Sequence, residues 1–102
     1  MPYDHAWEKF FNAVRYLAAG YGTIQERLCD ACIHGLGPLL ERENPPEILE
    51  DFRNLQDQIT KIKPTGSEGS IPDTIAQMTT GEAGNVAENI VSIFNRIATR
   101  RD

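Results

Sequence analysis

The sequence predicts an all-α protein, a compact bundle of four main helices with a short extra helical turn before the last one. Apolar residues recur with the helical period of about 3.6 in four segments, and each segment has the start and stop signals of a helix. No segment alternates apolar and polar residues for long enough to indicate a strand. The 102 residues have the length of one domain, so we expect residues 1–102 to form a single helical bundle.

The first predicted helix covers residues 4–19, with Asp4 as its N-cap and Gly20 after its end. Its apolar side chains share one broad face and its polar side chains share the opposite face. Several of the apolar side chains are aromatic, which is a large apolar surface for so small a bundle. If the bundle cannot cover all of it, the remainder is a protein interface. The aromatic candidates for such an interface are Trp7, Phe11 and, on the opposite face, Tyr16.

The second predicted helix begins with a capping box, in which Thr23 is the N-cap and Glu26 lies three residues later. Its apolar seam runs as far as Leu36. We expect this helix to kink near Gly35-Pro38, because proline has no N–H and its ring clashes with the carbonyl group four residues earlier.

The third predicted helix starts at Asn44-Pro45-Pro46-Glu47, which combines a cap, a proline at the first helical position and an acid in the first turn. Its apolar seam has heptad spacing and consists of Ile48, Phe52, Leu55, Ile59 and Ile62, and Pro64 closes the helix. The opposite face is acidic, which is typical either of a solvated face or of a contact surface for a basic partner. The acidic candidates for protein binding are Glu47, Glu50, Asp51 and Asp57.

A flexible loop is expected at about 63–72, followed by a short turn from Pro72 to about Met78. Thr79 and Glu82 form a second capping box, which starts the last helix. The apolar seam of this helix again has heptad spacing and consists of Val86, Ile90, Ile93 and Ile97. The two heptad seams suit packing within the bundle, and they could also meet a second copy of the chain to form a homodimer.

The segment CDACIH holds both cysteines of the chain, Cys29 and Cys32, together with His34. If the segment is helical, the two thiols share an edge and His34 points away from Cys32. A structural zinc site has four ligands, and its Cys-x-x-Cys pairs usually lie on turns. We therefore interpret Cys32 as a core residue and expect His34 to pair with Asp30 on the polar face. A metal-binding or thiol-redox switch at Cys29 and Cys32 is the alternative, with His34 as the third candidate metal ligand.

Arg27 is followed by a histidine, His34, with six residues between them. This spacing is similar to the motif of HEPN-type helical ribonucleases, although Leu28 stands where that family usually has a polar residue. The resemblance covers two residues and implies a remote alternative, RNA cleavage that uses Arg27 and His34.

Composition excludes several other classes of function. The net charge is −5, and no basic stripe is present to neutralise phosphates, so we expect no nucleic-acid partner. No apolar run approaches the roughly 20 residues that cross a bilayer, and no signal peptide is expected at the N-terminus. The glycine-rich GSEGS segment lacks the Gly-Lys-Ser/Thr of a phosphate-binding loop. These features predict a cytoplasmic, acidic, non-enzymatic interaction module without a cofactor or metal, of the adaptor, chaperone or inhibitor type.

Overall fold

The computed structural model describes residues 2–37, 44–61 and 69–100. Within these ranges the chain forms helices and no strand, which confirms the predicted all-α fold. The five α-helices are α1 (Pro2–Ala19), α2 (Ile24–Asp30), α3 (Leu49–Ile59), α4 (Ser70–Ala76) and α5 (Thr80–Arg100). A π-helical segment, η1 (Ala31–Leu36), continues α2, and a 3₁₀ turn, η3 (Pro46–Ile48), precedes α3.

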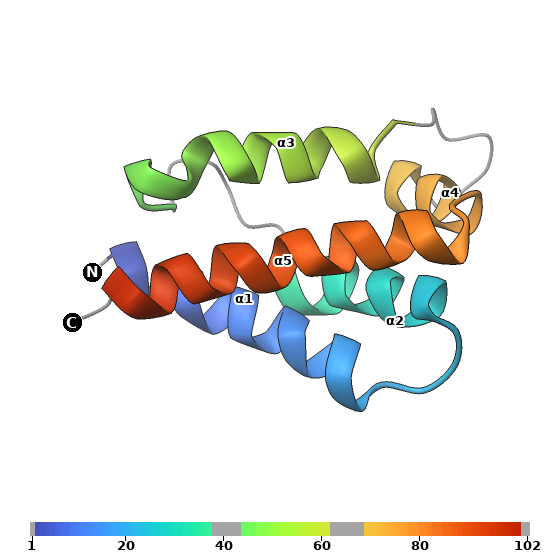
Figure 1. Cartoon of the computed structure of the whole chain (residues 1–102), viewed down its shortest axis with the longest axis horizontal. Helices are drawn as coiled ribbons and strands as arrows, with labels where there is room; N and C mark the ends of the chain where they lie inside the picture. The colour runs from blue at the N-terminus through green and yellow to red at the C-terminus, as the bar shows by residue number, and fades with distance from the viewer. Residues whose placement is uncertain (1, 38–43, 62–68, 101–102) are drawn as a thin grey trace.

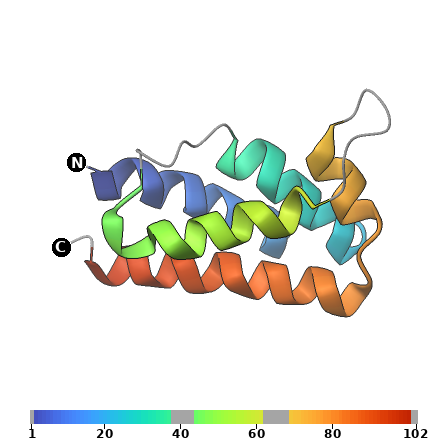
Figure 2. The same ribbon diagram turned by 90° about the horizontal axis from the view of Figure 1, so that it is seen from above.

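The helices pack around α5, the longest of them (Figure 1). Helix α1 runs antiparallel to α5 and packs against it, and α2 with η1 turns back along α1. Helix α3 packs on the other side of α5, while the short α4 lies at one end of the bundle (Figure 2). The radius of gyration is 13.0 Å, about the value expected for a compact chain of 100 residues.

The described residues of both heptad seams are buried inside the chain. The buried seam residues are Ile48, Phe52, Leu55 and Ile59 on one side, and Val86, Ile90, Ile93 and Ile97 on α5. Phe10 of α1 meets Phe52 edge to face, with ring centroids 6.4 Å apart, so the core is continuous from α1 to α3. Because the described seam residues are used within one chain, they offer no apolar face to a second copy.

Helix α1 begins earlier than predicted and buries a narrower stripe. It starts at Pro2, so Asp4 lies in the first turn and is not the N-cap. The helix ends as expected, where the N–H of Gly20 donates to the carbonyl oxygen of Tyr16 at 3.0 Å. The buried stripe consists of Ala6, Phe10, Ala13 and Leu17. Trp7 is only half-buried and Phe11 is exposed.

The second helix has the predicted capping box, but its irregularity begins before the predicted kink. The Glu26 N–H donates to Thr23 Oγ1 at 3.1 Å, and the Thr23 N–H donates to the Glu26 carboxylate at 3.3 Å. The backbone changes to the π pattern at Ala31, several residues before Gly35. The N–H of Gly37, whose φ is 58°, donates to the carbonyl of Cys32 at 3.2 Å and closes the segment. Pro38, the predicted cause of the kink, lies outside the described residues.

Gly35 fixes the distance between η1 and α1. A Cβ atom at Gly35 would lie 2.6 Å from Cα and 2.7 Å from N of Ala13, which is closer than real Cβ atoms approach backbone. Both residues are fully or almost fully covered. The backbones of the two segments therefore meet directly, and only glycine fits at this position.

The third helix is shorter than predicted. Its first turn is 3₁₀, and Pro45, rather than Asn44, is the residue that precedes it. Helix α3 already ends at Ile59, and the predicted end signal Pro64 and the last seam residue Ile62 lie outside the described residues.

Arg96 connects α5 to the beginning of the third helix. Its guanidinium forms an ion pair with Asp51, and its Nη2 donates to the carbonyl oxygen of Glu47 at 2.6 Å. One side chain thus binds both a carboxylate in the first turn of α3 and a backbone carbonyl in η3.

The predicted loop at 63–72 is too long at its C-terminal end. Ser70–Pro72 form the first turn of α4, which follows Gly69 with φ 95°, and residues 62–68 are not described. Pro72 is tolerated there because the first helical turn needs no internal N–H donor. The second capping box is confirmed, since the Glu82 N–H donates to Thr79 Oγ1 at 3.0 Å and the Thr79 N–H donates to the Glu82 carboxylate at 2.8 Å.

Replacement of Gly35 by alanine is expected to destabilise the protein by about 1–3 kcal/mol, because the new methyl group must push η1 away from Ala13. The matched control is Gly84→Ala in α5, where a Cβ would have nothing within 4 Å. That change should stabilise the protein by roughly 0.5–1 kcal/mol through helix propensity. Urea unfolding followed by circular dichroism measures both, and equal effects of the two substitutions would contradict the close contact.

The capping box at α5 should make stability depend on pH. The hydrogen bonds from the backbone and the side chain of Thr79 lower the pKa of Glu82 below its usual value. The folded state therefore gains stability from this carboxylate above the ordinary glutamate pKa of about 4.3 and loses it as the pH falls through the lowered pKa. We expect Glu82→Gln to destabilise the protein at neutral pH, with a difference from the wild type that shrinks in acid. A difference that stays constant down to acid pH would contradict this assignment.

Candidate functional site

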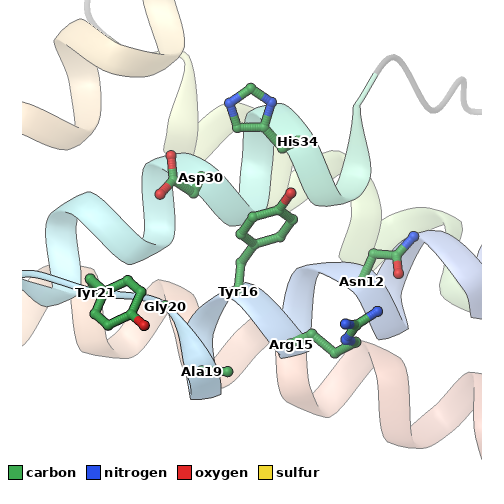
Figure 3. A pocket seen from close by; sticks show the side chains of 8 residues that line it. All are labelled: Asn12, Arg15, Tyr16, Ala19, Gly20, Tyr21, Asp30 and His34. Atoms are coloured by element: carbon green, nitrogen blue, oxygen red, sulfur yellow. The ribbon is translucent and has the colours of Figure 1, made fainter.

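An open hollow on the surface lies between the C-terminal half of α1 and the α2–η1 segment (Figure 3). Its volume is about 570 Å³, and it is open to solvent. We call it the tyrosine groove, and its lining residues are Asn12, Arg15, Tyr16, Ala19, Gly20, Tyr21, Asp30 and His34. Among the sequence-predicted candidates, it contains Tyr16 and His34.

Tyr16 and His34 meet across the groove. Their ring centroids are 6.1 Å apart with the planes tilted by 39°, and both side chains are exposed. In Figure 3, Tyr16 rises from α1 toward the helix that carries Asp30 and His34. His34 directly precedes Gly35, so the close contact of Gly35 with Ala13 determines how near the two rings lie.

Tyr21 stands at one end of the groove with 93% of its surface exposed. It lies in the linker between α1 and α2, between Gly20 and Gly22, and Gly22 has φ 91°, which favours glycine. Arg27 of α2 binds the end of α1, just before this linker: its Nη1 donates to the carbonyl oxygen of Leu17 at 2.8 Å. A tyrosine so exposed on a supported linker is available for contact with another molecule.

The groove is lined by a positive and a negative side chain, Arg15 and Asp30, which form no ion pair with each other. The sequence predicts a pair between Asp30 and His34, but in the structure no hydrogen bond or ion pair joins these two side chains. Arg15 lies on the α1 wall and Asp30 on the opposite wall. The two tyrosine hydroxyls donate and accept hydrogen bonds, and the imidazole of His34 adds a further polar group beside an aromatic ring, so the groove can bind a polar ligand that carries an aromatic group.

Arg27 and His34 do not form a joint site. The guanidinium of half-buried Arg27 binds the end of α1, whereas His34 opens into the tyrosine groove, which Arg27 does not line. Two groups that act together on one phosphodiester must reach the same reacting atoms. The arrangement within one chain therefore gives no support to the ribonuclease resemblance.

The cysteines lie on the core side of the segment, away from the groove. Cys32 is 2% exposed, and burial raises the pKa of its thiol to about 12. Burial and, to a lesser extent, the charge of Asp30 also raise the pKa of Cys29. Thiolates are the metal ligands and nucleophiles, so this environment favours the interpretation of Cys32 as a core residue over that of a switch.

The acidic candidates divide into two groups. Asp51 is paired with Arg96, and the carbonyl of Glu47 accepts from the same arginine. Glu50 and Asp57 are exposed on the outer side of α3. The acidic face is therefore partly structural, and its carboxylates are not all available to a basic partner.

Trp7 and Phe11, the remaining aromatic candidates, lie on the side of α1 that faces α5. Their rings stack with centroids 4.9 Å apart, and both contact the half-buried Phe94 of α5. They are thus separated from Tyr16, which lies on the other side of the same helix. The sequence candidates belong to three surfaces and not to one.

Sequence reasoning missed Tyr21, Arg15 and Asn12 as site residues. The only local signal is the Gly-Tyr-Gly linker, which exposes a tyrosine, and the presence of the other two in the same hollow as His34 depends on how the helices pack.

Within the described ranges, no group of three or more His, Cys, Asp or Glu side chains is placed to hold a metal ion. None of the described helices combines the length and the apolar character needed to cross a bilayer. No protein-family model, no curated protein and no solved structure matches this chain. The groove must therefore be interpreted from its own chemistry.

The raised thiol pKa values predict slow alkylation of the folded protein. At pH 8, Cys29 should react with iodoacetamide more slowly than a cysteine in a short peptide, and Cys32 should react only after unfolding. Peptide mapping by mass spectrometry, with and without urea, distinguishes the two sites. Rapid alkylation of Cys32 in the folded state, or its protection by added zinc, would support the switch instead.

Proposed function

We propose that this protein is a non-enzymatic protein-binding module that takes a peptide segment of a partner into the tyrosine groove. The observation that carries the proposal is the combination of an open hollow of about 570 Å³ with two exposed tyrosines, Tyr16 and Tyr21, in its lining. An adaptor, a chaperone and an inhibitor all work through such a surface.

The composition of the groove supports binding to protein. Tyrosine and arginine are enriched in protein interfaces and in their energetic hot spots, because each combines a large contact area with hydrogen bonding. The groove contains both, in Tyr16, Tyr21 and Arg15, next to the acid Asp30. A partner segment with an aromatic side chain and charged neighbours would match these groups.

The same lining residues favour binding over catalysis. His34 and Asp30 could transfer protons, but the lining residues include no serine, threonine, cysteine or lysine that could act as a nucleophile beside them. The thiol of Cys32 is buried on the core side and keeps its proton at neutral pH, because burial raises its pKa to about 12. The proposal therefore assigns no reaction to the groove.

Selection from a displayed peptide library on the immobilised protein tests the proposal without knowledge of the natural partner. We expect enriched peptides whose dissociation constants, measured by calorimetry, rise by about tenfold or more in Tyr16→Ala and in Tyr21→Ala. Asn85→Ala, an exposed position on α5 outside the groove, is the control and should bind as the wild type does.

Two results would count against the groove. If no peptide is enriched, the binding function itself fails. If the Tyr16 and Tyr21 variants bind normally while the double variant Glu50→Lys and Asp57→Lys loses binding, the partner instead contacts the acidic outer side of α3.

A further inference from the structure

A second row of apolar side chains follows α1 and α5 beside the core. On α1 it consists of Trp7, Phe11 and Val14, and on α5 of Ala87, Val91 and Phe94. We call these six residues the apolar strip. On both helices the spacing is four residues and then three, which is heptad spacing. The strip is distinct from the buried seam of α5, which contains other residues.

The apolar strip is incompletely covered. Phe11 is 37% exposed and Val91 is 43% exposed, and the other four residues are half-buried. The rings of Trp7 and Phe11 lie 5.8 and 6.0 Å from that of Phe94, so the aromatic part is one continuous surface. Two antiparallel helices with a heptad row at their common edge have the geometry that receives further helices in a bundle.

On each helix, one charged or polar residue at the border of the strip lies before its central residue and a different one lies after it. On α1, exposed Glu8 and Arg15 stand on either side of Phe11. On α5, exposed Glu88 and Asn95 stand on either side of Val91. Helices α1 and α5 are antiparallel (Figure 1). Since Phe94 contacts both Trp7 and Phe11, Val91, one turn before Phe94, lies at about the level of Phe11.

We propose that the apolar strip is a self-association surface, on which a second copy of this chain packs strip against strip. The two-fold axis lies between the two strips and is perpendicular to the helices. It passes over α1 near Phe11 and over α5 near Val91, so each helix packs antiparallel on its copy. A two-fold contact places each residue opposite the residue at the reversed position.

The border residues then complement one another on both helices. Glu8 of one copy lies opposite Arg15 of the other, and this pair occurs twice. Glu88 of one copy lies opposite Asn95 of the other, so none of these four positions meets a like charge. Charge complementarity of this kind fixes register and selects the partner, and a single axis satisfies it on α1 and α5 together.

Sedimentation equilibrium over a range of protein concentrations tests the contact. The wild type should convert from monomer to dimer as concentration rises, and Val91→Lys should remain monomeric because the lysine desolvates poorly in the apolar strip. Asn54→Lys, which adds the same charge at an exposed position of α3, should dimerise as the wild type does. Circular dichroism establishes that both variants are folded.

A charge exchange tests the axis. Glu8→Arg alone and Arg15→Glu alone each place like charges opposite one another and should raise the dimer dissociation constant by about tenfold. The double variant with both changes restores opposite charges and should dimerise as the wild type does. Loss of folding cannot produce this recovery.

A wild type that stays monomeric up to its solubility limit would overturn the proposal. A dimer that survives Val91→Lys would show that copies meet elsewhere, and a double variant as weak as the single ones would overturn the two-fold axis. Peptide binding in the tyrosine groove is measured by a separate experiment, so the failure of one proposal can be distinguished from the failure of the other.

Discussion

The direct contact between the backbones of η1 and α1 is the constraint on which the other features depend. At Gly35 there is no room for a side chain against Ala13, and this contact lies within the π-helical segment η1. π-Helical segments are rare and occur frequently at functional sites. Here the segment carries His34 immediately before the contact, and α1 carries Tyr16 one turn after it, so the contact sets the width of the tyrosine groove.

The sequence predicted the parts of the fold that local chemistry determines. Both capping boxes involve residues three apart, and the structure contains both, at Thr23 and at Thr79. The start of the π pattern was not predicted, because the sequence signals for an irregular helix, Gly35 and Pro38, come after Ala31, where the pattern begins. The bond of Arg96 to Asp51 was equally hidden, since it joins residues 45 positions apart in the chain.

The candidate site was predictable only in fragments. The helical period indicated that Tyr16 is exposed and that His34 points away from Cys32, and the structure has both arrangements. The period of one helix says nothing about which surface it faces across a groove, so the meeting of Tyr16 with His34 could not be predicted. Tyr21 lies in a linker, where no periodicity exists, and its exposure follows from the folded position of the Gly-Tyr-Gly segment.

Helix α1 presents three surfaces, each with its own chemistry. Its buried stripe holds the core, one flank with Tyr16 forms the groove, and the other flank with Phe11 carries the apolar strip. Arg15 lies on the outer side between the two flanks, where it lines the groove and also borders the strip. If the guanidinium of Arg15 binds an acidic side chain of a peptide in the groove, it is less available to Glu8 of a second copy. We therefore expect peptide binding and self-association to be coupled through Arg15, so that by thermodynamic linkage each changes the affinity of the other by the same factor.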